Sequence, residues 1–101
     1  MQNILVTSAG KRVVLVELFK RALKACDQAA KVYTTDLNPE LAPAGIASDK
    51  CFRVPRVLSS DYISILLNIC VRNNIGMVIP TIDTELLVLS QNKQKFYDKG
   101  I

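Results

Sequence analysis

Short runs of aliphatic and β-branched residues alternate along this chain with longer segments in which apolar residues recur at helical spacing. The short runs predict strands over residues 4–7, 31–35, 51–54 and 77–79. The first of them, ILVT, has no polar residue between its apolar ones, which is typical of a strand covered on both faces, as in a parallel sheet. The pattern therefore predicts a buried sheet with helices between its strands.

The segment from Lys11 to Cys26 has the spacing of an amphipathic helix. Its charged residues occupy the face opposite to the apolar one. We expect the buried stripe to be Leu15, Leu18, Phe19, Ala22, Leu23 and Cys26. Residues 40–47 contain Pro43 and Gly45 and predict only a short helical turn or a loop.

A second amphipathic helix is predicted after Ser59 or Ser60, either of which can cap it, with Asp61 in its first turn. It ends at the Asn-Asn pair of residues 73–74. We expect its buried stripe to be Tyr62, Ile63, Leu66, Leu67 and Cys70.

The last predicted helix begins at a cap supplied by Thr81 or Asp83 and runs to about Lys99. Gly100 follows at a position where helices commonly end in a left-handed residue. Because Ile101 comes where a further strand would begin, we expect residues 1–101 to be one domain and the N-terminal fragment of a longer protein.

The order of the elements predicts an α/β fold, a Rossmann-like doubly wound sheet with helices on both faces. Right-handed crossovers favour about four parallel strands in the spatial order 3-2-1-4. Without a following strand or domain, the fourth strand of the isolated chain leaves its backbone N–H and C=O groups open on one edge. We expect the chain either to cover this edge with its last helix or to self-associate by pairing with another copy.

The amino-acid composition argues against several classes of function. Lys and Arg number 13 and Asp and Glu 9, which makes the net charge +4, and histidine is absent. Without histidine the commonest general base and metal ligand is missing, so we assign no catalytic residue and no metal ligand. The basic residues are spread along the helices, which argues against nucleic-acid binding.

The chain lacks an apolar run of membrane-spanning length (~20 residues) and a signal-like start, and we expect a soluble, cytoplasmic domain without membrane contact. The three cysteines, Cys26, Cys51 and Cys70, are expected to be small buried apolar residues.

In open α/β sheets, ligands bind beyond the carboxyl ends of the strands. The first such segment here is the turn at residues 7–12, where Gly10 allows a tight bend and Ser8, Lys11 and Arg12 offer donors for a phosphate or carboxylate. Neither the G-x-G-x-x-G pattern nor the Walker pattern is present. Gly10 can equally serve the turn alone, with the two cations facing solvent.

Three other strand ends carry candidate binding residues. Asp36 ends the second strand, where a nicotinamide enzyme would hold a ribose hydroxyl, but it can equally cap the turn that follows. Arg56 follows the third strand, and its guanidinium suits a bidentate grip on a carboxylate. Substrate contact and helix capping are both open for the candidates after the fourth strand, Thr81, Asp83 and Glu85.

Three segments together resemble the amino-terminal, pre-ATP-grasp domain of ATP-grasp ligases, in particular proteins described as carbamoyl-phosphate synthase large-subunit-like. They are NILVTSAGKR at residues 3–12, TDLNP at 35–39 with SDK at 48–50 and VPR at 54–56, and VIPTIDTEL at 78–86. The family members often carry two arginines after the glycine, where this chain has Lys11 and Arg12.

The resemblance implies a ligase that joins a small-molecule carboxylate, or bicarbonate, to an amine through an acyl phosphate formed with ATP. It places ATP and Mg²⁺ in the ATP-grasp domains that follow, outside this chain. It also implies that Gly10, Asp36, Thr81 and Glu85 serve either the substrate or the packing of the domains. The alternatives are a Rossmann-type nucleotide or NAD-binding module and a non-catalytic interaction domain.

Overall fold

The computed structural model describes residues 3–8, 10 and 12–101. Four strands form one sheet in the order β3-β2-β1-β4, and all three pairings are parallel. The strands are β1 (Asn3–Thr7), β2 (Val32–Asp36), β3 (Lys50–Arg53) and β4 (Ile75–Pro80). The predicted fold class and strand order are therefore confirmed. In this register Thr7 lies between Thr35 and Pro80, so the carboxyl ends of three strands share one edge.

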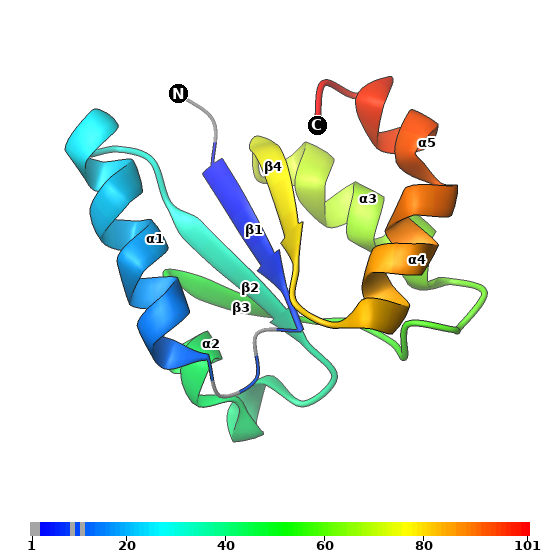
Figure 1. Cartoon of the computed structure of the whole chain (residues 1–101), viewed down its shortest axis with the longest axis horizontal. Helices are drawn as coiled ribbons and strands as arrows, with labels where there is room; N and C mark the ends of the chain where they lie inside the picture. Colours follow the sequence, from blue (N-terminus) through cyan, green and yellow to red (C-terminus); the bar gives the residue numbers. More distant parts are fainter. Residues whose placement is uncertain (1–2, 9, 11) are drawn as a thin grey trace.

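Helices cover both faces of the sheet, as Figure 1 shows. On one side lie α1 (Val13–Cys26) and α2 (Pro43–Ala47), which follows a 3₁₀ turn at Pro39–Leu41. On the other lie α3 (Tyr62–Arg72), α4 (Asp83–Gln91) and α5 (Lys93–Tyr97). The neighbours Leu5 and Val6 are both fully buried, and each belongs to a different core cluster. A strand without polar alternation is thus covered twice, as its sequence predicts.

The first core cluster, beneath α3 and α5, contains Leu5, Val54, Tyr62, Leu66, Cys70, Ile75 and Phe96. The predicted stripe of α3 is confirmed, because its remaining members, Ile63 and Leu67, pack against this cluster. The second cluster, beneath α1 and α2, contains Val6, Val16, Leu23, Ala30, Val32 and Ala44. The sheet therefore lies between two helical layers, each packed on its own core cluster.

The predicted stripe of α1 is wrong in its angular position. Val16 and Leu23 are buried, whereas Leu18 is 53% exposed and Ala22 is also exposed. Four consecutive aliphatic residues at 13–16 make the apolar arc too broad for its spacing alone to select the contact face. Cys26 is exposed at the last position of α1, so its expected burial is wrong, while Cys70 is buried and Cys51 partly so.

The predicted caps are also corrected. Ile82 occupies the cap position of α4 and Asp83 is its first residue, without a side-chain cap bond. The hydroxyl of Thr81 is used elsewhere, as described below. Asp61 occupies the cap position of α3 and does not lie within its first turn. The predicted last helix is interrupted at Asn92, whose side-chain amide donates to the Val88 carbonyl (2.8 Å).

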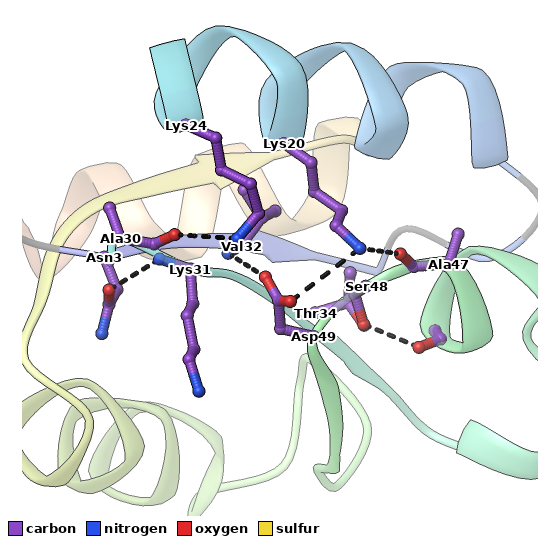
Figure 2. Close-up of polar contacts among 11 residues, drawn as sticks. Asn3, Lys20, Lys24, Ala30, Lys31, Val32, Thr34, Ala47, Ser48 and Asp49 are labelled. Carbon is purple, nitrogen blue, oxygen red and sulfur yellow. Dashed lines mark hydrogen bonds and ion pairs between the residues drawn. The ribbon is translucent and has the colours of Figure 1, made fainter. Parts of the chain in front are cut away.

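Polar contacts tie α1 and α2 to the start of β2, as Figure 2 shows. The Lys20 ammonium of α1 donates to the Ala47 carbonyl (3.0 Å) at the end of α2 and lies 3.8 Å from Asp49. The Asp49 carboxylate accepts from the Val32 amide (2.8 Å), and the Asp49 amide donates to the Val32 carbonyl (2.9 Å). This exchange aligns β3 with β2. None of the helices in the described part of the chain is long and apolar enough to cross a membrane.

Candidate functional site

A buried carboxylate lies at the shared carboxyl edge of the sheet. Glu85, in the first turn of α4, is fully buried and accepts hydrogen bonds from the hydroxyls of Thr7, Ser8 and Tyr62. The Tyr62 hydroxyl lies 3.0 Å from the carboxylate, and the Thr81 amide donates to it over 3.4 Å. A buried charge is tolerated when it is hydrogen-bonded in this way. We call Glu85 and these four donors the Glu85 cluster.

The Glu85 cluster joins the loops that follow β1 and β4. The Thr81 hydroxyl lies 2.9 Å from the Thr7 carbonyl and 2.8 Å from the Ser8 carbonyl, and it donates to this pair. The Arg12 guanidinium, which follows the loop after β1, donates to the Thr81 carbonyl over 3.4 Å. These contacts make the two loops one unit, so the ends of β1 and β4 cannot separate without breaking them.

The loop after β1 turns in the left-handed region. Ser8 has φ +50° and Gly10 has φ +55°. For serine this conformation costs about 1 kcal/mol or more, and its hydroxyl bond to Glu85 and its carbonyl bond to Thr81 hold it there. The Gly10 carbonyl accepts from the Ala44 amide (2.9 Å), which connects the same turn to α2.

Tyr62 enters the Glu85 cluster from the first turn of α3. Burial raises the pKa of its hydroxyl far above the usual value, and the neighbouring Glu85 charge raises it further. Both effects disfavour a phenolate. Tyr62 therefore stays protonated and acts as a donor to the carboxylate.

A pocket of about 200 Å³ opens beside the Glu85 cluster. It is lined by Ser8, Leu37, Val54, Pro55, Arg56, Val57 and Tyr62. Arg56 is exposed, and within the described chain its guanidinium has no acidic partner. Because Arg56 is both exposed and part of the pocket lining, its guanidinium can hold one end of a small anion, such as a carboxylate.

The structure brings most of the candidate residues to this edge. Ser8, Arg12, Thr81 and Glu85 lie in or against the Glu85 cluster, Gly10 forms the adjoining turn, and Arg56 lines the pocket. Lys11 lies outside the described residues. Glu85 has no exposed surface, and its carboxylate is occupied by donors of the chain itself.

Two candidates stand apart from the Glu85 cluster. The Asp36 carboxylate accepts from the Asn38 amide (2.9 Å), the turn contact that the sequence left open as its alternative role. Asp83 is exposed, and nothing in the described chain bonds to its side chain. Next to Asp36, the buried Thr35 hydroxyl has no partner among the described residues.

Sequence reasoning missed Thr7 and Tyr62 as site residues. Thr7 belongs to an apolar strand run, and Tyr62 fits the buried stripe of α3, so both read as core residues. A signal was available for Tyr62, since a buried tyrosine hydroxyl needs a hydrogen-bond partner. The partner, Glu85, lies 23 positions further along the chain and could not be identified from spacing.

The fold and this edge define a parallel α/β domain of the kind that binds small molecules at the carboxyl ends of its strands. The family of PylC-like N-terminal domains matches residues 4–101. The chain belongs to this family, the pre-ATP-grasp domain of ATP-grasp ligases, and the resemblance of the three sequence segments is confirmed. The comparison with curated proteins gave no match.

Proposed function

We propose that this chain is the substrate-side domain of an ATP-dependent carboxylate–amine ligase, of the carbamoyl-phosphate synthase-like kind. Family membership supports an ATP-grasp ligase as the context of the domain. The observation that carries the proposal is the pocket beside the Glu85 cluster, whose lining includes Arg56. The rigid Glu85 cluster forms one wall of the pocket, and the guanidinium supplies the charge for an anionic substrate.

In this proposal the residues of the chain bind and orient the substrate, and none of them takes part in the chemical reaction. Arg56 holds the carboxylate or bicarbonate, while Glu85, Thr81 and Arg12 keep the two loops in place around it. The described residues contain no cluster of three or more His, Cys, Asp or Glu side chains that fits a metal ion. As part of the proposal, and as the family resemblance implies, ATP and Mg²⁺ bind in ATP-grasp domains of the same protein outside this chain.

Steady-state kinetics of the intact ligase test the proposal. ADP should form only when a carboxylate or bicarbonate is present. Arg56→Ala should raise the KM for this substrate about tenfold or more, because a charge-assisted contact contributes about 1.5–3 kcal/mol. The matched control is Arg21→Ala, which removes an exposed guanidinium from α1 on the other side of the sheet.

Three results would contradict the proposal. An unchanged KM in Arg56→Ala would remove Arg56 from substrate binding. Micromolar binding of ATP or NAD by residues 1–101 alone, measured by calorimetry, would instead favour a nucleotide-binding module. The absence of any substrate-dependent ADP formation in the intact protein would favour the interaction domain.

A further inference from the structure

A second hollow adjoins the pocket beside the Glu85 cluster. It has a volume of about 430 Å³ and is lined by Leu37, Asn38, Arg53, Val54, Pro55 and Ile65. Three of these residues, Leu37, Val54 and Pro55, also line the pocket that contains Arg56. Because the two hollows share these walls, they form the two halves of one groove. We call the half with Arg56 the near hollow and the other half the far hollow.

The groove lies at the carboxyl edge of the sheet, between the segments that follow β2 and β3 and the beginning of α3. Tyr62, the first residue of α3, lines the near hollow, and Ile65 lines the far hollow. Three residues of an α-helix span about 4.5 Å along its axis. A ligand that occupies both hollows must therefore extend by about this length beyond the group that lies near Arg56.

The two hollows differ in the charge that they offer to a ligand. Arg56, in the near hollow, has no acidic partner within the described chain. Arg53, in the far hollow, donates to both carboxylate oxygens of Glu40 (3.0 and 2.8 Å) and to the Leu37 carbonyl (3.1 Å). Because the Glu40 charge already offsets that of Arg53, a second anionic group would find no free cation there. The other walls of the far hollow are mostly aliphatic, which favours an uncharged apolar group.

We propose that the substrate is a monocarboxylate with an apolar tail of about four to six carbons, a length that spans the offset between the hollows. Arg56 holds the carboxylate, and the tail lies against Leu37 and Ile65 in the far hollow. This inference rests on the proposed function, which places the carboxylate beside Arg56, and it selects an extended acid over bicarbonate. Bicarbonate leaves the apolar walls in water, and a dicarboxylate brings its second charge towards the Glu40 carboxylate.

A series of straight-chain acids tests the inference on the intact native ligase. The kcat/KM for carboxylate-dependent ADP formation is measured with bicarbonate, acetate, butyrate, hexanoate and octanoate. We expect a rise of up to about fourfold for each methylene group that enters the far hollow, because burial removes it from water. Octanoate should be no better than hexanoate, since its last carbons extend beyond the hollow. Bicarbonate and acetate should be the poorest substrates.

A substitution in the far hollow tests where the tail binds. Ile65→Trp fills part of this hollow with a larger side chain. The kcat/KM for hexanoate should fall about tenfold or more, while that for acetate, which occupies only the near hollow, should not change. The matched control is Val71→Trp, which changes an exposed aliphatic residue of the same helix outside both hollows. It should leave the whole series as in the native ligase.

The outcomes separate this inference from the proposed function. A flat series, or one in which bicarbonate or acetate is the best substrate, overturns the inference, and the proposed function stands if Arg56→Ala still raises the KM for these acids. A preference for hexanoate that persists in Ile65→Trp places the tail elsewhere and overturns the inference as well. ADP formation with none of these acids contradicts the proposed function itself, and this inference with it. The series on the native ligase requires no variant to fold.

Discussion

Replacing the buried carboxylate at the carboxyl edge gives the sharpest test of the site. In the native protein the Thr7 hydroxyl and the Thr81 backbone amide donate to the same carboxylate oxygen of Glu85. In Glu85→Gln the side-chain oxygen of glutamine can still accept both of these hydrogen bonds. The amide NH₂ then faces the hydroxyls of Ser8 and Tyr62, which donate to the other oxygen. Both hydroxyls must then turn to accept from the amide, and the buried Tyr62 hydroxyl loses the hydrogen bond that it donates to Glu85.

The expected loss follows from these contacts. Hydrogen bonds to a charged group contribute about 1.5–3 kcal/mol and neutral ones about 1 kcal/mol, so four weakened or reversed contacts sum to several kcal/mol. Glutamine also avoids the cost of burying a charge, which offsets part of this loss. We expect Glu85→Gln to lower the free energy of unfolding by about 2 kcal/mol, and Glu85→Ala, which leaves all the donors unpaired, by about 4 kcal/mol.

Urea unfolding followed by far-ultraviolet circular dichroism measures both variants at one fixed protein concentration. The control is Asp83→Asn in the same first turn of α4. It should cost under about 1 kcal/mol, since this exposed carboxylate has no hydrogen-bond or ion-pair partner among the described residues and lies at the favourable end of the helix dipole. A Glu85→Gln variant as stable as the native chain would refute the reasoning, because the carboxylate would then contribute no more to the free energy of unfolding than a neutral acceptor does.

Two further predictions concern packing and pH. In Gly45→Ala the new Cβ would lie 2.8 Å from the Cys51 sulfur and 2.9 Å from its Cβ, so overpacking of about 1–3 kcal/mol should outweigh the gain of about 1 kcal/mol in helix propensity. Thermal unfolding should show a lower Tm, only partly restored by Cys51→Ala, and an unchanged or raised Tm would contradict the packing at this position. Burial raises the pKa of Cys70 to about 12 from 9.0 and raises that of Tyr62 above its usual value. Above about pH 9 the unfolded chain therefore releases protons that the folded chain keeps, so stability should be constant up to that pH and fall beyond it. Urea midpoints between pH 7 and pH 11 measure this fall, Cys70→Ala should make it shallower, and equal slopes in the two proteins would show that this thiol does not contribute.

The fold could be predicted from local patterns because each pattern has a local cause. A parallel strand buried on both faces needs an unbroken apolar run, as in β1, and the stripe of α3 follows from the 3.6-residue period. The handedness of the crossovers then leaves few arrangements of four strands. The site could be predicted only as a region, since the topology places the strand ends together whatever their side chains do.

The amino-acid sequence by itself determined the elements of this protein, their order and the edge at which polar loops gather, because these depend on short-range spacing and on chain handedness. The tertiary structure alone decided which face of α1 is buried, because a run of four aliphatic residues is compatible with several buried faces. It also decided the partners of Glu85, because Thr7 and Glu85 are 78 positions apart and meet only when β1 and β4 are adjacent. Hydrogen bonds across such distances depend on how strands and helices pack in space, and no local pattern records them.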